Sequence, residues 1–346
     1  MPSPNASRYD SPPRSRNAAG EMRKVGLEIE LGGISLQRTL DLLQSSLGGT
    51  VEVQSRTEGA LHDTAFGKFK VELDSKPLKE RRYMHVLEQL GMEPDSSTAQ
   101  LVEESVLQVA SELVPIEIVT PPIPIDRLHE LDPLWSSLRS AGAEDTHSSV
   151  LNAFGLHLNP EMPDGETATL LGVMRAFLLL EDWIMDASRI DISRRIAPYI
   201  RPFPEAYRRM ILQPDYAPDA AGLVRDYLTH SPTRNRPVDL LPLFVHLHGE
   251  ALLKSVSDAP LVKARPTYHY RLPNCELATP NWSPARDWNR WVAVEKLAEN
   301  PELLTELSVS YLETFDLPLR LQSGGWLDSV RARLSLPGED SQKSVA

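Results

Sequence analysis

The sequence predicts an α+β fold with a mixed or antiparallel sheet. Segments with strand periodicity gather before residue 160, and one more lies near residue 270. Between them, residues 165–257 have helical patterns that do not alternate one by one with strands. Strict alternation would indicate parallel βαβ units, so these patterns favour antiparallel pairing. The chain has 346 residues, of which 41% are hydrophobic, and this is enough for one large core.

The first predicted strand covers residues 25–31 and alternates apolar and acidic residues. As a strand it places Glu28 and Glu30 on one face, and Leu27, Ile29 and Leu31 on the other. Two ionised carboxylates on one strand face repel each other. Water can screen them on a solvated surface, or a cation can lie between them.

Later strands repeat the pattern of polar residues on one face. Lys70, Glu72 and Asp74 share a face at 66–74, Glu117 lies in an apolar strand at 115–120, and His157 and Asn159 share a face at 154–160. A further strand is predicted at 50–54, and a last one at 267–272 carries Arg271, with a continuation to Glu276.

Helices are predicted where apolar residues recur with a period of 3.6. Ser35 is the expected N-cap of the first helix, and Gly48 follows its end. The predicted ranges are 35–47, 98–113, 125–141, 166–187, 220–230, 238–255, 285–299 and a final helix from 301. Residues 1–20 predict a disordered leader, residues 21–335 one domain with a helical middle section at about 165–257, and residues 336–346 a disordered tail.

Charge and cysteine content exclude several classes of protein. The net charge of −12 and the pI of about 5.3 argue against nucleic-acid and acidic-membrane partners. Cys275 is the one cysteine, so an internal disulfide and a thiolate zinc cluster are excluded. The most apolar run, 170–180, is short and contains Arg175, and the N-terminus lacks a signal-peptide pattern. A cytoplasmic location is therefore expected.

If the strands are neighbours in one sheet, their polar faces line a single acidic trough. Carboxylates with one imidazole and no thiolate suit Mg²⁺ or Mn²⁺. Such a trough predicts two metals and an anionic substrate such as ATP. Neither a Walker loop nor a Gly-x-Gly-x-x-Gly run occurs, so metals and basic side chains would have to hold the nucleotide.

Four short motifs together resemble a known family. They are Gly26-Leu27-Glu28-Ile29-Glu30, Phe69-Lys70-Val71 followed by Asp74, Glu117-Ile118-Val119-Thr120-Pro121 and Gly155-Leu156-His157-Leu158-Asn159. In this order they are similar to the amidoligases, which are relatives of glutamine synthetase and glutamate–cysteine ligase, and the resemblance covers most of residues 23–300. It implies a mainly antiparallel sheet curved into a trough that holds ATP and two or more Mg²⁺ ions. Helices would pack on the convex side, with a helical insertion.

The resemblance also implies a role for each matching residue. The metal ligands would be Glu28, Glu30, Glu117, His157 and Glu276. Lys70 and Asn159 would bind the nucleotide or substrate, Asp74 would act in catalysis, and Arg271, together with Arg195, would hold phosphate. Two departures stand out: Asp74-Ser75-Lys76 replaces the Asp-Gly-Ser of many members, and Leu277 and Ala278 follow Glu276 where the last strand commonly has Glu-x-Arg.

The expected activity is ATP- and Mg²⁺-dependent joining of a carboxylate, activated as an acyl phosphate, to an amine. The expected partners are a small-molecule or peptide carboxylate and an amine. Two alternatives stay open. One is a metal-dependent phosphoester or amide hydrolase that uses the same carboxylates. The other is a catalytically inactive interaction protein on a ligase-like scaffold, since the departure at the last strand leaves the catalytic arginine to Arg271.

Overall fold

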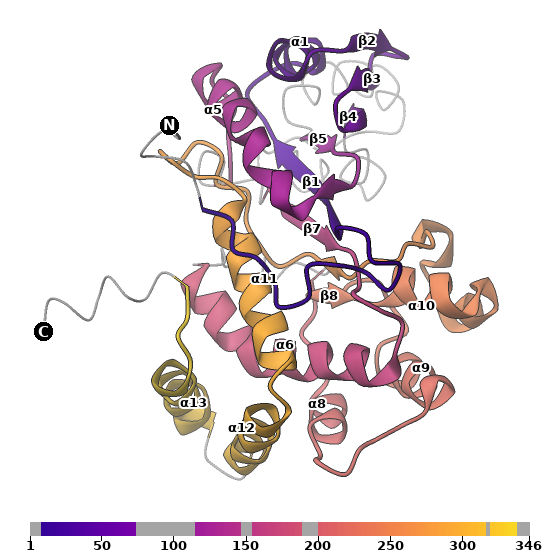
Figure 1. Ribbon diagram of the computed structural model, residues 1–346, viewed down its shortest axis with the longest axis vertical. Helices are drawn as coiled ribbons and strands as arrows, with labels where there is room; N and C mark the ends of the chain where they lie inside the picture. The colour runs from indigo at the N-terminus through magenta and orange to yellow at the C-terminus, as the bar shows by residue number, and fades with distance from the viewer. Residues whose placement is uncertain (1–7, 74–114, 147–153, 189–199, 316–318, 338–346) are drawn as a thin grey trace, which may run out of the picture.

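A computed structural model describes residues 8–73, 115–146, 154–188, 200–315 and 319–337 (Figure 1). It confirms an α+β fold with an antiparallel sheet. The predicted helix at 98–113, Asp74 and Arg195 lie outside the described residues.

One sheet of nine strands organises the described part of the chain. Its strands are β1 (Lys24–Leu31), β2 (Thr50–Val53), β3 (Glu58–Thr64), β4 (Gly67–Leu73), β5 (Ile116–Val119), β6 (Ile123–Pro124), β7 (Leu156–Pro160), β8 (Val238–Asp239) and β9 (His269–Tyr270). Their order is β2-β3-β4-β5-β1-β7-β9-β8, and β6 pairs with β1. Every pairing between these strands is antiparallel.

The central strand β1 has the two faces that its sequence predicts. Val25, Leu27, Ile29 and Leu31 are buried, whereas Glu28 and Glu30 on the other face keep partial contact with solvent. The apolar face continues across the sheet, because Ile29 lies opposite Ile118 on β5. The sheet therefore has one face in the core and one polar face.

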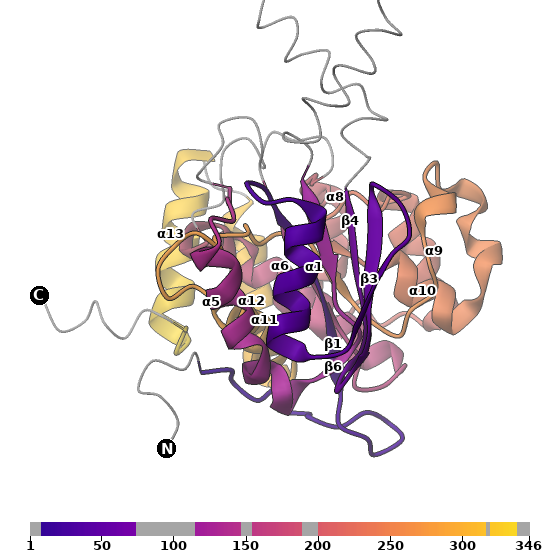
Figure 2. The same ribbon diagram turned by 90° about the horizontal axis from the view of Figure 1, so that it is seen from above.

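Helix α1 (Leu36–Leu47) covers the apolar face near β2, β3 and β4. Ser35 caps it as expected, by accepting a hydrogen bond from the Arg38 amide at 3.2 Å. A Cβ atom at Gly59 of β3 would lie 2.6 Å from Leu40 of α1, so the close approach of this helix requires glycine there. Helix α5 (Asp132–Ser140) packs beside α1, and Figure 2 shows both on the same side of β1, β3 and β4.

The other helices gather away from α1 and α5, in the lower half of Figure 1. Long helix α6 (Thr167–Ala187) is largely buried and packs against α11 (Ala285–Ala298), α12 (Pro301–Thr314) and α13 (Leu319–Arg333). Smaller helices are α8 (Glu205–Ile211), α9 (Ala220–His230) and α10 (Leu241–His248), with 3₁₀ turns at Ile125–Leu131, Glu250–Ser255 and Ala259–Leu261. Most predicted helices therefore occur.

The prediction and the structure differ at three elements. The helix expected at 238–255 is wrong, because β8 precedes α10 and Gly249, with φ of 84°, ends it. The strand expected at 267–272 is limited to β9. Strand β3 was not predicted, since Glu58–Thr64 does not alternate polar and apolar residues, yet it pairs with both β2 and β4.

Residues 8–23 correct the prediction of a disordered leader up to residue 20. The indole nitrogen of Trp288 on α11 donates to the Asp10 carbonyl at 2.8 Å, and the Asp10 amide donates to Asn289 at 2.8 Å. Arg23 forms a buried ion pair with Glu295, also on α11. The proline- and serine-rich composition indicates disorder, but the segment is held by contacts that composition cannot reveal. Their partners lie more than 270 positions away along the chain.

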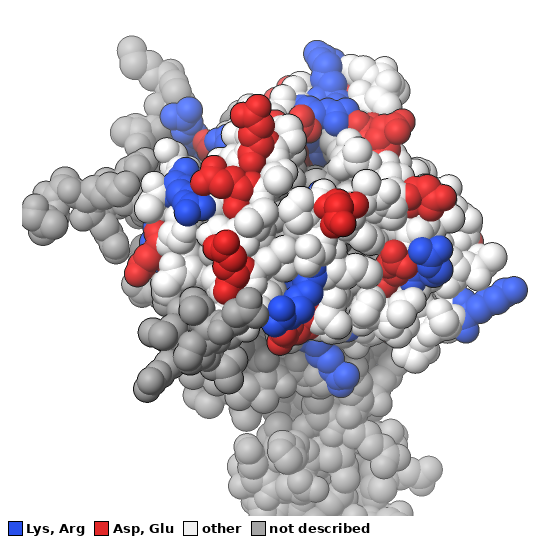
Figure 3. All heavy atoms as spheres, turned by 90° about the horizontal axis from the view of Figure 1, so that it is seen from below, with Lys and Arg blue, Asp and Glu red and all other residues white. Residues whose placement is uncertain are grey.

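Among the described residues, no helix is both long enough and apolar enough to cross a bilayer. Figure 3 shows the molecule from below, where acidic and basic side chains are interspersed. No continuous basic patch covers the described part of that face.

Candidate functional site

Four carboxylates lie in one row across the polar face of the sheet. Glu58, Glu72, Glu117 and Glu30 are direct neighbours in register on β3, β4, β5 and β1. Lys70 forms ion pairs with Glu72 and, at 3.2 Å, with Glu58. Opposed side chains on adjacent strands have Cβ atoms about 5 Å apart, so like charges there repel each other. This row of acids is therefore a favourable environment for a cation.

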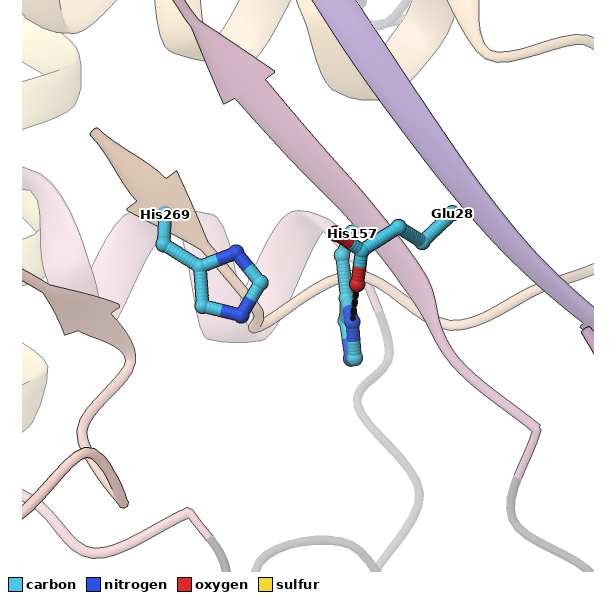
Figure 4. A group of neighbouring side chains, drawn as sticks. All are labelled: Glu28, His157 and His269. Atoms are coloured by element: carbon cyan, nitrogen blue, oxygen red, sulfur yellow. Dashed lines mark hydrogen bonds and ion pairs between the residues drawn. The ribbon is translucent and has the colours of Figure 1, made fainter. Parts of the chain in front are cut away.

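A second group of polar side chains is centred on Glu28, which lies opposite His157 of β7 in register. The carboxylate of Glu28 accepts hydrogen bonds from His157 Nδ1 at 3.1 Å, from Asn159 Nδ2 at 3.0 Å and from Arg265 Nη1 at 3.1 Å. Figure 4 shows the bond between His157 and Glu28. Because an ionised carboxylate only accepts, Nδ1 of His157 carries a proton in this arrangement.

His269 on β9 completes this group through Asn159. Its Nδ1 lies 2.7 Å from the Asn159 side-chain oxygen, and the amide nitrogen of Asn159 is already directed at Glu28. The oxygen accepts, so Nδ1 is protonated and Nε2 of His269 carries the lone pair. That Nε2 is buried and has no hydrogen-bond partner among the described residues.

Glu28, His157 and His269 can share one cation. One ligand atom from each residue lies within 4.8 Å of the others. The two imidazole rings are 5.3 Å apart between centroids and nearly perpendicular, at 76° (Figure 4). In the described part of the chain, this is the one group of three or more histidine, cysteine or acidic residues with that spacing.

The pKa values of these three groups leave all of them able to bind a cation. Burial lowers the pKa of His157 despite the opposing effect of Glu28, and it holds the pKa of His269 well below its usual value. For Glu28, burial alone would raise the pKa, but the hydrogen bond from His157 and then the charge interactions with His269, His157 and Arg265 hold it well below its usual value. Near pH 7 the carboxylate is therefore ionised and both rings are neutral, which is the state that coordinates metals.

Arg271 directly follows β9 and lies close to the acids. It is buried, and its Nη1 donates to the Arg234 carbonyl at 2.8 Å. Burial and the charge of Arg234 lower the pKa of Arg271, whereas the charges of Glu28 and Glu30 act in the opposite direction. A guanidinium in this position can bind an anion at the acidic face.

Among the described residues, the others predicted for the site do not belong to the group of three that can share one cation. Glu30 accepts a hydrogen bond from the Gly155 amide at 2.6 Å, and Glu117 is buried opposite Glu30. Glu276 forms an ion pair with Arg286 of α11 at 2.8 Å and is not part of the group around Glu28. Asp74 and Arg195 lie outside the described residues.

Sequence reasoning missed His269 and Arg265. His269 and Arg271 are two positions apart in the strand predicted at 267–272, so their side chains share a face of that strand. This spacing was a signal that His269 lies on the same face of the sheet as Arg271. The spacing of His269 and Arg271 also matches the Glu-x-Arg pattern expected of the last strand, with the imidazole of His269 in place of the carboxylate. No local pattern indicated Arg265, which lies in the loop before β9.

Asp239 of β8 lies opposite His269 and gives a testable dependence of stability on pH. Burial raises the pKa of Asp239 from 3.8 to about 7. The folded protein therefore binds a proton that the unfolded chain has released. The contribution of Asp239 to the free energy of unfolding is therefore largest below about pH 4. It falls towards pH 7, by about 1.4 kcal/mol per pH unit at most.

We expect Asp239→Asn to remove this decline. The measurement is urea unfolding of the chelator-treated protein between pH 4 and pH 7, with Asp215→Asn as an exposed control. If the free energies of unfolding of wild type and Asp239→Asn differed by the same amount at every pH from 4 to 7, the expectation would be contradicted.

Comparison with known proteins adds one finding. The family model described as "putative amidoligase enzyme" matches residues 21–293, which include every described residue of the site. No curated protein and no solved structure matches the chain. The match covers most of the chain and contains the acids of β1 and β5 and the histidines of β7 and β9. The chain therefore belongs to the amidoligase family, whose name denotes enzymes that form amide bonds.

Proposed function

We propose that this protein is a cytoplasmic, ATP- and divalent-cation-dependent carboxylate–amine ligase. The observation that carries the proposal is the convergence of Glu28, Glu30, Glu117 and His157 on the polar face of one antiparallel sheet. Membership of the amidoligase family supports amide formation as the reaction.

The proposed reaction has two steps. A carboxylate oxygen of the acid attacks the γ-phosphorus of ATP, and the bond to the β–γ bridging oxygen breaks to release ADP. The amine then attacks the acyl carbon of the acyl phosphate, inorganic phosphate leaves, and the amine nitrogen loses a proton. Activation is needed because a free carboxylate at neutral pH has no adequate leaving group.

Each charged group of the polar face has a role in this proposal. Glu30 and Glu117 would hold the Mg²⁺ that accompanies ATP, and Glu28, His157 and His269 would hold a second cation. Bound cations neutralise phosphate charge during phosphoryl transfer. Lys70, Asn159 and Arg271 would orient the phosphates or the substrate carboxylate. Asp74 and Arg195 keep the roles that the family resemblance implies, in catalysis and in phosphate binding.

Hydroxylamine gives a test that does not require knowledge of the natural amine. The purified full-length chain is incubated with Mg²⁺·ATP, hydroxylamine and, in turn, amino acids, dicarboxylic acids and short peptides. We expect at least one acid to give a hydroxamate and an equal amount of ADP. With an ¹⁸O-labelled carboxylate, one labelled oxygen should appear in the released phosphate.

Binding is tested separately by thermal unfolding with a non-hydrolysable ATP analogue and Mg²⁺. At 100 times the dissociation constant, the analogue should stabilise the protein by about 2.7 kcal/mol. Absence of stabilisation under all metal conditions would contradict the proposal. Hydrolysis of phosphoesters or amides without ATP would favour the hydrolase alternative, which the two histidines and one glutamate also suit.

A further inference from the structure

We infer that Glu28, His157 and His269 bind one transition-metal ion of the imidazole-preferring class, such as Zn²⁺, Co²⁺ or Fe²⁺, in preference to Mg²⁺. The inference names the second cation of the proposed ligase, so its meaning for catalysis rests on the proposed function. The binding itself can be measured without turnover.

The donor set favours a transition-metal ion. Two of the three side chains offer imidazole nitrogen, and one offers carboxylate oxygen. Mg²⁺ is bound in proteins through oxygen ligands and water, whereas imidazole suits Zn²⁺, Fe²⁺ and neighbouring ions. A site with two nitrogens of three ligands therefore favours the transition ions.

The distances between the three side chains suit one shared ion. In a tetrahedral site with metal–ligand bonds of about 2.1 Å, the ligand atoms lie about 3.4 Å apart. All three residues have a ligand atom within 4.8 Å of one another, and because Nδ1 of His157 donates to Glu28, the lone pair of His157 is on Nε2. Small side-chain movements are therefore sufficient to close the three ligands around one ion.

His269 is held with one ring nitrogen available as a ligand. Asn159 accepts a hydrogen bond from its Nδ1, which fixes the ring and leaves the lone pair on Nε2. His269 is 1% exposed, and Nε2 has no hydrogen-bond partner among the described residues. A metal ligand whose other nitrogen is held by an amide or carboxylate shows the arrangement seen here.

Three protein ligands also fit a reactive site. Catalytic zinc sites commonly have three protein ligands and leave a position for water or substrate. The site lies in the same sheet face as Glu30 and Arg271, where an anionic substrate would bind.

The test measures metal binding by the full-length protein after chelator treatment and desalting. Titration calorimetry with Zn²⁺, Co²⁺ and Mg²⁺ should give dissociation constants at least about 100-fold lower for Zn²⁺ and Co²⁺ than for Mg²⁺. Visible absorption should show a saturable Co²⁺ spectrum at one ion per chain. Pulsed electron paramagnetic resonance of the Cu²⁺-loaded wild type should show nitrogen coupling from two imidazoles, so this readout does not depend on a folded variant.

Substitutions at residue 269 give the sharpest comparison. Loss of a residue that only supports a metal ligand weakens metal binding about 10–100-fold. His269→Ala removes a ligand itself, so it should weaken Co²⁺ binding by more than about 100-fold. His269→Glu should weaken Zn²⁺ and Co²⁺ binding about tenfold or more and strengthen Mg²⁺ binding, because an oxygen replaces a nitrogen. His246→Ala and His248→Ala, at exposed positions at the end of α10, should leave the Co²⁺ spectrum unchanged.

The outcomes separate this inference from the proposed ligase activity. Mg²⁺ binding as tight as Zn²⁺ and Co²⁺ binding, or nitrogen coupling that persists at full strength in His269→Ala, would overturn the inference and leave the hydroxamate test untouched. Tight Co²⁺ binding that depends on His269 would support the inference even if no acid gives a hydroxamate, and only the ligase proposal would then fail.

Discussion

Glu28→Gln is expected to lower kcat/KM for hydroxamate formation by about 10³-fold. The Glu28 carboxylate accepts hydrogen bonds from His157, Asn159 and Arg265, and these bonds fix the three side chains around the site. Glutamine has nearly the same shape but is neutral and offers one acceptor oxygen. A glutamine oxygen at the Oε1 position loses the hydrogen bond from His157, at about 1.5–3 kcal/mol, and turns the bonds from Asn159 and Arg265 into bonds to a neutral acceptor, each weaker by about 1 kcal/mol, which together correspond to a loss of this order.

The matched control is Glu52→Gln. Glu52 also pairs with a histidine, His62, at 2.7 Å, but this pair is on the exposed part of β2 and β3. We expect its kcat/KM to stay within about twofold of wild type, because surface pairs contribute little. If folded Glu28→Gln, checked by circular dichroism, kept more than about a tenth of wild-type kcat/KM, Glu28 would not belong to the reaction centre.

The second large effect concerns stability. Arg23 binds Glu295 through two hydrogen bonds of 2.7 Å, and Trp291 donates to the same carboxylate at 2.6 Å. Arg23 is 1% exposed and Glu295 is 4% exposed. Glu295→Ala would leave a buried guanidinium without its counter-charge, and we expect the free energy of unfolding to fall by about 3–5 kcal/mol.

Urea unfolding of the full-length protein measures this effect. Glu205→Ala, which removes an exposed partner of Arg209 on α8, should change the free energy of unfolding by less than about 1 kcal/mol. Replacing both residues, as in Arg23→Met with Glu295→Leu, should recover part of the loss because no unpaired charge stays buried. Equal stability of Glu295→Ala and wild type would show that the pair does not hold the N-terminal segment on α11.

Local patterns were sufficient for the main elements of the fold. The period-two alternation at 25–31 predicted β1, and Ser35 and Gly48 predicted both ends of α1, because caps and alternation act between residues close in sequence. Strand β3 escaped prediction because its strand form depends on pairing with β2 and β4. The N-terminal segment was misread for the same reason, since its partners are on α11.

The site was predicted in part. Alternation placed Glu28 and Glu30 on one strand face, and the structure brings His157 to Glu28 in register. Glu276 lies three residues beyond Pro273 and pairs with Arg286, which no pattern within the strand could indicate. His269 entered the group because the antiparallel pairing of β7 and β9 sets it beside Asn159.

The sequence by itself determined the α+β class, the two faces of β1 and the amidoligase family, because these depend on residues two to four positions apart and on short ordered motifs. Only the tertiary structure decided which imidazole and which arginine reach Glu28. His269 and Arg265 lie more than 230 residues from Glu28 along the chain, and the strand order, the register and the path of the loop before β9 bring them together. Register depends on the packing of the whole sheet against its core, and no local stretch of sequence contains that information.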